Sequence, residues 1–139
     1  MCAKRDTMQA NKYVLDCNVY ISYIINGKLE SLAEYILHNE IQVLFCKELA
    51  TEIMDVLQRP HIKKYLHDTA NSYLKIINAI TLPVKITKKY TGSPDPKDDY
   101  LFAICISHKA ILVTGDKILQ RFDKSPISVI TTTAFKQLL

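Results

Sequence analysis

Short apolar runs and longer amphipathic segments follow one another along this chain. Apolar runs bounded by turn residues predict buried strands. Segments in which apolar side chains return every three or four positions predict helices that bury one face. The pattern predicts strands over residues 13–16, 41–45, 82–87, 111–114 and 127–130, and helices over 19–25, 30–39, 48–58, 61–79, 97–108, 116–122 and 133–138.

The alternation of strands and helices predicts an α/β fold. Parallel strands need long crossovers, and helices supply them on both faces of a sheet. We therefore expect one three-layer domain over residues 13–139, with a central parallel sheet of about five strands. Residues 1–12 are polar and lack the apolar core of a signal peptide, so we expect them to form a flexible N-terminal tail.

Composition narrows the class of protein. The chain has 139 residues, of which 48% are hydrophobic and 23% are charged, as in an ordinary globular domain. Its apolar runs all fall short of the roughly 18 residues that a membrane-spanning helix needs. The four cysteines form no Cys-x-x-Cys pair and no zinc spacing with histidine, which favours the reducing cytoplasm over an oxidising compartment.

Four acidic residues stand where apolar runs give way to helices. Asp16 ends one predicted strand, and Asp116 follows another. Asp99 lies at the start of a predicted helix, and Glu52 lies at the edge of a helical apolar stripe. An open parallel sheet gathers its strand-to-helix turns along one edge, so these carboxylates are expected to converge. Converging carboxylates repel one another unless a cation lies between them, and their oxygens suit Mg²⁺ or Mn²⁺. The pattern predicts metal-dependent phosphodiester chemistry.

Helix capping is a plainer explanation for some of these acids. Aspartate is common at helix N-termini, so Asp16 and Asp116 are each compatible with a cap. The segment from Asp95 to Asp98 has the form of a capping box that follows a proline. Capping leaves Asp99 unexplained at the start of a buried apolar helix, where a carboxylate without a partner is costly. We therefore assign Asp99, rather than Asp98, to the site.

Four segments resemble the PIN domain ribonucleases, and most closely the toxin components of bacterial toxin–antitoxin pairs. Val14-Leu15-Asp16-Cys17-Asn18-Val19 is similar to the family's opening Leu-Asp-Thr-Asn-Val motif. Residues 48–60 resemble its second acidic helix, residues 95–103 its Asp-Pro-x-Asp-Asp-x-x-x-Ala signature, and residues 112–119 its Leu-Val-Thr-Gly-Asp segment. The resemblance runs from residue 13 to about residue 131, and its specificity lies in the order and spacing of four motifs.

The resemblance implies a PIN fold and an endoribonuclease that depends on Mg²⁺ or Mn²⁺. The family's acidic site carries over to Asp16, Glu52, Asp99 and Asp116, with Asn18 and Thr114 in supporting positions. RNA is then the substrate, an antitoxin protein a partner, and a homodimer the expected assembly. Cys17 replaces the family's threonine, and its side chain is expected to point away from the carboxylates because neighbours in a strand alternate.

Lysines beside the acidic residues bear on substrate binding. The net charge of +4 favours a polyanionic partner, although each basic cluster alone is equally compatible with a solvated surface. Lys97 and Lys117 flank Asp99 and Asp116 in the sequence, so we expect them to contact the RNA backbone.

Two other functions stay open. A PIN-fold domain without turnover would bind RNA or act as a scaffold, because the presence of acidic residues does not prove activity. A phosphatase that forms an aspartyl phosphate also uses an aspartate after the first strand. Such an enzyme places a second aspartate two residues later, where this chain has Asn18, whose amide cannot serve as a general acid.

Overall fold

The computed structural model describes residues 11–138 and contains one five-stranded parallel sheet. The strands are β1 (Lys12–Leu15), β2 (Gln42–Phe45), β3 (Leu82–Pro83), β4 (Ile111–Val113) and β5 (Val129–Ile130), in the order β3-β2-β1-β4-β5. The helices are α2 (Cys17–Ile25), α3 (Leu29–His38), α4 (Lys47–Leu57), α5 (Pro60–Lys63), α6 (Ala70–Ile80), α7 (Asp99–His108), α8 (Lys117–Gln120) and α9 (Thr132–Lys136), and a 3-10 turn, η1 (Pro96–Asp98), precedes α7. The predicted α/β class with a parallel sheet is confirmed.

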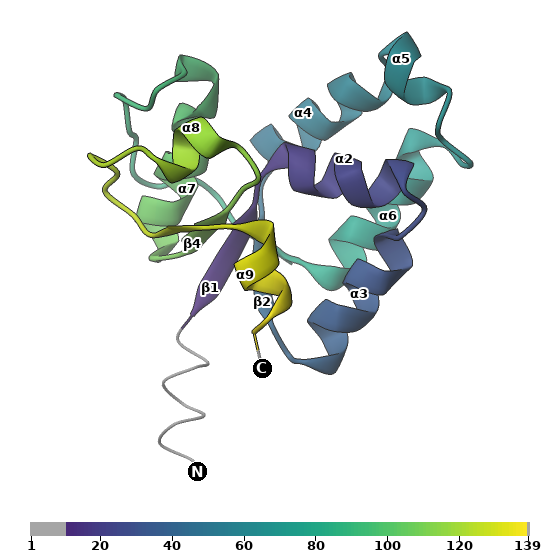
Figure 1. Cartoon of the computed structure of the whole chain (residues 1–139), viewed down its shortest axis with the longest axis horizontal. Helices are drawn as coiled ribbons and strands as arrows, with labels where there is room; N and C mark the ends of the chain where they lie inside the picture. Colours follow the sequence, from purple (N-terminus) through teal and green to yellow (C-terminus); the bar gives the residue numbers. More distant parts are fainter. Residues whose placement is uncertain (1–10, 139) are drawn as a thin grey trace.

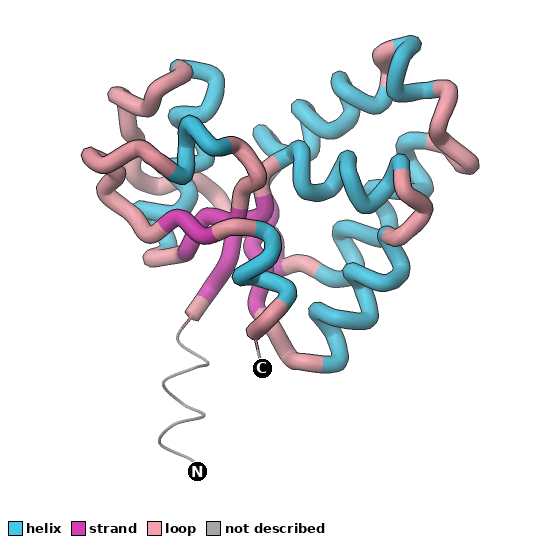
Figure 2. Tube along the Cα trace, in the orientation of Figure 1, coloured by secondary structure: helices cyan, strands magenta, loops and turns pink. Residues whose placement is uncertain are grey.

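Helices lie on both sides of the sheet. Figure 1 shows α7 and α8 on one side of β1 and α2, α3, α4 and α6 on the other, while α9 lies in front. Figure 2 shows the strands, in magenta, between these two groups of helices. The sheet grows from β1 through β2 and β3 in one direction and through β4 and β5 in the other. The strand order therefore reverses between β1 and β4, where open α/β sheets form a crevice at the carboxyl ends of their strands.

The core explains why these segments fold as they do. Val14 and Leu15 of β1 are fully buried, as expected for the central strand of a parallel sheet. Residues 101–105 of α7 are buried around the whole helix, as their unbroken apolar sequence predicted, because α7 packs against β1 and β4. The C-terminal helix α9 is held by Tyr35, whose hydroxyl donates to the carbonyl oxygens of Phe135 and Leu138.

The helix predicted over residues 61–79 is divided in two. Helix α5 ends at Lys63, and α6 begins only at Ala70. Thr69 is the N-cap of α6, and its side-chain oxygen accepts a hydrogen bond from the Ser72 amide at 3.1 Å. This cap stabilises a new helix start inside a periodic apolar pattern.

The strand predicted over residues 82–87 is shorter than expected. Only Leu82 and Pro83 pair with β2, and the chain then leaves the sheet edge. Ser107 of α7 explains the departure, because its hydroxyl accepts hydrogen bonds from the Thr87 and Lys88 amides at 2.9 and 2.8 Å. These amides are thus satisfied by α7 and not by a neighbouring strand.

Several further predictions concern the ends and the cysteines. Of the tail predicted over residues 1–12, residues 1–10 lie outside the described part of the chain. Lys12 already belongs to β1. Cys17, Cys46 and Cys105 are free and buried, while Cys2 lies outside the described residues. Within residues 11–138, the helices are all too short or too polar to cross a membrane.

Candidate active site at the carboxyl ends of β1 and β4

Asp16 and Thr114 stand side by side because their strands are in register. Leu15 of β1 lies opposite Val113 of β4, so the next residue of each strand lies at the same level beyond the sheet. The Asp16 amide donates to the Val113 carbonyl at 2.9 Å, and the Thr114 amide donates to the Ile130 carbonyl at 3.1 Å. These bonds fix both backbones at the point where the strand order reverses.

Asp16 is a buried carboxylate with a defined partner. Only 5% of the residue is exposed, and its Oδ2 accepts a 2.8 Å hydrogen bond from the fully buried Thr114 hydroxyl. Burial raises the pKa of Asp16, the charges of Glu52 and Asp116 raise it further, and the Thr114 hydrogen bond opposes both effects. Although Asp16 precedes α2, its side chain makes no capping hydrogen bond, so capping does not account for it.

Asp116 is both a helix cap and a member of the acidic group. Its Oδ1 accepts a 2.8 Å hydrogen bond from the Ile118 amide and thereby caps α8. Its own amide donates to Thr114 Oγ1 at 3.0 Å. The Thr114 hydroxyl therefore accepts a hydrogen bond from the backbone amide of Asp116 and donates one to the carboxylate of Asp16.

Glu52 reaches this edge of the sheet from α4 and is held by a tyrosine of α7. The Tyr100 hydroxyl donates a short hydrogen bond to Glu52 Oε1, and both residues are half-buried. Burial and this hydrogen bond raise the pKa of Tyr100 well above its ordinary value, so the phenol stays protonated and remains a donor. The bond joins helices from opposite sides of the sheet. The sequence alone does not point to Tyr100, because nothing in its local sequence indicates a partner 48 positions away.

The structure places Asp98 and Asp99 differently from the sequence analysis. The predicted capping box with Asp98 does not form, because Asp95 alone caps η1 by accepting from the Lys97 amide at 3.1 Å. Burial, followed by the charges of Asp16, Asp95, Glu52 and Asp116, raises the pKa of the half-buried Asp98 to about 6. Asp98 is therefore within electrostatic reach of the other acids.

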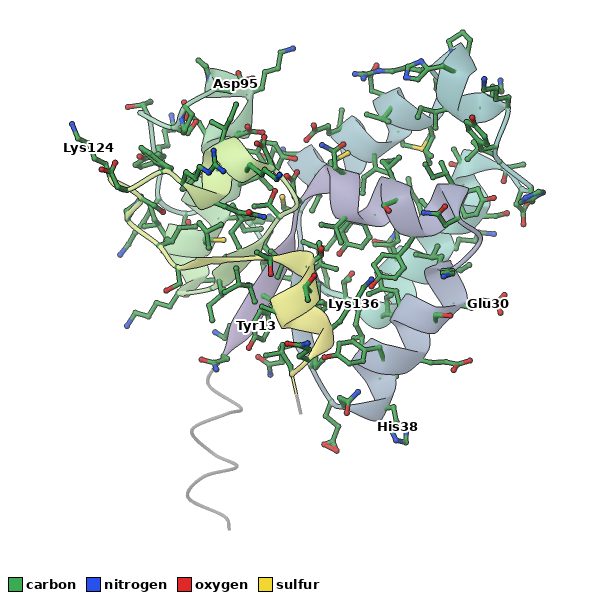
Figure 3. The ribbon with its side chains drawn as sticks, viewed as in Figure 1. Tyr13, Glu30, His38, Asp95, Lys124 and Lys136 are labelled. Carbon is green, nitrogen blue, oxygen red and sulfur yellow. The ribbon has the colours of Figure 1, made fainter. Side chains whose placement is uncertain are left out.

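Asp99, in contrast, is tied to the loop before η1. Its Oδ1 accepts hydrogen bonds from the Ser93 amide at 3.1 Å and from the Ser93 hydroxyl. The carboxylate that the sequence left unexplained thus has a partner in Ser93, and it anchors the start of α7. Figure 3 labels Asp95 on the same loop, at the upper end of the molecule.

The remaining predicted residues lie on the surface around this site. Asn18, Lys97 and Lys117 are exposed. The one ion pair among residues 11–138 joins Arg59 to Asp55, so neither lysine is paired with an acid there. Cys17 is buried; burial raises the pKa of its thiol, and the charges of Glu52 and Asp16 raise it further.

The acidic group suits a divalent cation in its chemistry. Carboxylate oxygens are the ligands that Mg²⁺ and Mn²⁺ prefer, and mutual repulsion between Asp16, Glu52, Asp98 and Asp116 is relieved by a cation. In the described part of the chain, however, no three His, Cys, Asp or Glu side chains are arranged around a common metal position. The donor set fits such a metal, while its side chains are not already gathered as ligands.

The family model of the PIN domain matches residues 12–118. An uncharacterised protein of Methanocaldococcus jannaschii is 29% identical over 113 residues, which span 78% of this chain and 72% of that protein. Among solved structures, that of VapBC2 from Rickettsia felis, bound to a DNA fragment from their promoter, matches with a TM-score of 0.55 and 17% identity, over 86% of this chain and 98% of that chain. At this level of identity the structural match concerns the fold.

Proposed function

This chain belongs to the PIN domain family, and we propose that it is a ribonuclease that hydrolyses RNA phosphodiester bonds with Mg²⁺ or Mn²⁺. One observation carries the proposal. Asp16 is buried at the switch point of the sheet, accepts a hydrogen bond from Thr114, and shares its surroundings with Glu52 and Asp116. A buried carboxylate among like charges is costly for a fold unless it serves a ligand.

Four residues would hold the cation, namely Asp16, Glu52, Asp98 and Asp116. When bound, the cation would lower the pKa of a water molecule and stabilise the charge that develops on the phosphate. We assign Asp98 to this group in place of Asp99. Burial and the charges of the other acids raise the pKa of Asp98, whereas the Asp99 carboxylate accepts a hydrogen bond from the Ser93 amide.

The chain's other residues would orient these carboxylates and the substrate. Thr114 fixes the side chain of Asp16, and Tyr100 fixes that of Glu52. Ser93 anchors Asp99 and with it the first turn of α7, which follows Asp98 directly. Lys97 and Lys117 are exposed beside this edge and would contact RNA phosphates.

A role as the toxin of a toxin–antitoxin pair extends this proposal. The four sequence motifs resemble that branch of the family, and VapBC2 of Rickettsia felis shares the fold. An antitoxin protein would then be a partner, and a homodimer the assembly. The free, buried cysteines Cys17, Cys46 and Cys105 support a reducing compartment such as the cytoplasm.

Metal-dependent cleavage tests the proposal directly. Purified protein is incubated with single-stranded RNA and Mn²⁺ or Mg²⁺, with a chelated sample in parallel. We expect cleavage that chelation abolishes and that is lost in Asp16→Asn and Asp98→Asn. An exposed carboxylate elsewhere, changed in Asp123→Asn, is the matched control and should leave cleavage intact. Equal cleavage by Asp16→Asn and the wild-type protein would exclude this site as the catalytic centre.

A catalytically silent RNA-binding domain is the second candidate. It is favoured by one observation, the absence of a preformed three-residue metal position among residues 11–138. Thermal melting with increasing Mn²⁺ separates the two functions, because a ligand that binds only the folded state raises the melting temperature. A nuclease should be stabilised by Mn²⁺ and lose this response in Asp16→Asn, whereas a silent domain should show neither effect.

A further inference from the structure

Residues 59–67 form a basic and aromatic projection beyond the end of α4. The segment contains Arg59, Lys63 and Lys64 and no acidic residue. Ile62 and Leu66 pack against the core. The outward side chains are exposed: His61, Lys63, Lys64, Tyr65 and His67. Figure 1 shows α5 at the outermost end of the helices on its side of the sheet, and nitrogen-bearing side chains surround this end in Figure 3.

Tyr65 is an exposed aromatic side chain beside a cation. Half of the residue is accessible, at 50%, and Lys64 Nζ lies 5.2 Å from the centroid of its ring. The tripeptide Lys-Lys-Tyr occurs a second time at residues 88–90. There Tyr90 is half-buried, and its ring centroid lies 5.4 Å from that of Phe102. The exposure of Tyr65 is therefore a property of its place in the fold and not of its local sequence. Exposed aromatic rings flanked by cations suit the stacking of unpaired bases.

A pocket of about 410 Å³ adjoins this projection, between α4 and the start of α6. Met54 and Leu57 contribute apolar surface to it. Hydrogen-bonding and charged groups are contributed by five further residues, Gln58, Lys63, Asp68, Thr69 and Asn71. Amide and carboxylate groups of this kind can pair with the edges of bases, while apolar surface receives their faces.

Helix α4 connects this surface to the acidic group. Glu52 lies five residues before the C-terminal end of α4, about 8 Å along the helix axis, and Arg59 follows that end after one residue. A strand of RNA leaving the acidic group along α4 would therefore meet Arg59 and then the projection.

We infer that residues 59–67 and the adjoining pocket form a second contact surface for single-stranded RNA, a few nucleotides from the bond that is cleaved. Lys63 and Lys64 would contact phosphates, Tyr65 would stack on a base, and the pocket would receive a neighbouring base; Arg59 is already paired with Asp55. An acidic protein would also match the charge and could use an exposed tyrosine, so unchanged RNA affinity in the variants of this surface would point to that partner instead. This inference rests on the proposed function for the choice of RNA.

Binding without cleavage tests the inference. The full chain carrying Asp16→Asn, in chelator, is titrated against a labelled single-stranded RNA of mixed sequence. We expect Lys63→Glu with Lys64→Glu to weaken binding at least about tenfold and to reduce the log–log salt slope by about 1.4, which corresponds to two lost phosphate contacts. We expect Tyr65→Ala to weaken binding by about tenfold and to leave the salt slope unchanged. Gln58→Ala with Asn71→Ala should weaken it by about fivefold through the loss of base contacts.

The second Lys-Lys pair provides the matched control. Lys88→Glu with Lys89→Glu makes the same change of charge at another exposed pair, and it should alter affinity by no more than about twofold. Equal weakening by both double variants, or an unchanged affinity in the Lys63 and Lys64 variant, would overturn the inference. Thermal melting checks that each variant is folded.

These outcomes are separable from those of the proposed function. If the Lys63 and Lys64 variant binds RNA weakly but wild-type protein never cleaves RNA, the surface stands and the ribonuclease proposal fails. If wild-type protein cleaves RNA while all variants of the projection bind as the parent does, the ribonuclease stands and this inference fails.

Discussion

Thr114 Oγ1 donates a 2.8 Å hydrogen bond to Asp16 Oδ2 across 98 positions of sequence. Both residues are buried, so this hydroxyl is the polar partner that offsets the desolvation of the carboxylate. The relationship follows from the register of β1 and β4, which places the residues after Leu15 and Val113 side by side. It explains how a charged group is accommodated at the centre of the fold.

Removing the Thr114 hydroxyl should destabilise the protein. Thr114→Val keeps the shape of the side chain but leaves Asp16 Oδ2 and the Asp116 amide without their partner. We expect a loss of about 1–3 kcal/mol in the free energy of unfolding by urea. Thr114→Ser keeps the hydroxyl and should lose less, so equal losses in the two variants would show that the methyl group, and not the hydrogen bond, matters.

Asp98 and Asp99 should respond in opposite ways to replacement by asparagine. Asp98→Asn removes a charge repelled by the other acids, so the metal-free protein should keep its stability or gain some, while RNA cleavage is lost. Asp99→Asn weakens the hydrogen bonds from Ser93 and should cost about 1–2 kcal/mol in urea unfolding. A stability loss confined to Asp98→Asn would contradict the roles assigned here.

The metal-free protein should lose stability as pH rises through the titration of Asp98. An unfolded aspartate has a pKa of about 3.9, and the folded value is about 6. Between these values the folded state binds more protons than the unfolded state, so stability falls as pH rises. The contribution is fully present below about pH 4 and is lost once pH exceeds about 6. Urea unfolding in chelator at several pH values measures this, and Asp98→Asn should flatten the profile, whereas Asp123→Asn should not.

Tyr100 should act on the site through Glu52. Tyr100→Phe removes the hydrogen bond to Glu52 Oε1, and the loss of such a supporting partner typically lowers metal affinity or activity by about 10- to 100-fold. Tyr73 offers a matched control, because its hydroxyl accepts a 2.9 Å hydrogen bond from the His67 amide away from the acids. Mn²⁺ affinity from thermal melting should fall in Tyr100→Phe and stay constant in Tyr73→Phe. A similar fall in both variants would indicate a general structural effect.

Two tyrosines differ in what their hydroxyls contribute to stability. Tyr20 is fully buried, and its hydroxyl has no hydrogen-bond partner among the described residues. Tyr20→Phe should therefore leave the free energy of unfolding unchanged or raise it by up to about 1 kcal/mol. Tyr35→Phe loses a hydroxyl that holds α9 and should lower it by about 1 kcal/mol. Urea unfolding of the two variants measures these changes. A large loss of unfolding free energy in Tyr20→Phe would show that the Tyr20 hydroxyl has a partner such as a buried water.

The position of each element was largely predictable, but its ends were not. Burial of apolar side chains drives folding, so the period of the apolar pattern identifies strands such as β1 and buried helices such as α7. The break before α6 depended on the cap at Thr69, a signal present in the sequence that the apolar period concealed. The early end of β3 depended on Ser107, which no local pattern connects to residues 87 and 88.

The sequence by itself determined the parallel α/β fold and the placement of Asp16 and Asp116 after the strands β1 and β4, because alternation and apolar runs are local properties of the chain. Only the tertiary structure distinguishes the surroundings of Asp98 from those of Asp99, and our assignment of Asp98 to the site rests on that difference. Adjacent residues at a helix start point in different directions, and which of them meets the other acids depends on how η1 and α7 sit against the sheet. The Tyr100–Glu52 and Thr114–Asp16 hydrogen bonds are decided in the same way. Each needs two distant segments at hydrogen-bonding distance, and packing of the whole chain, rather than any local preference, sets that distance.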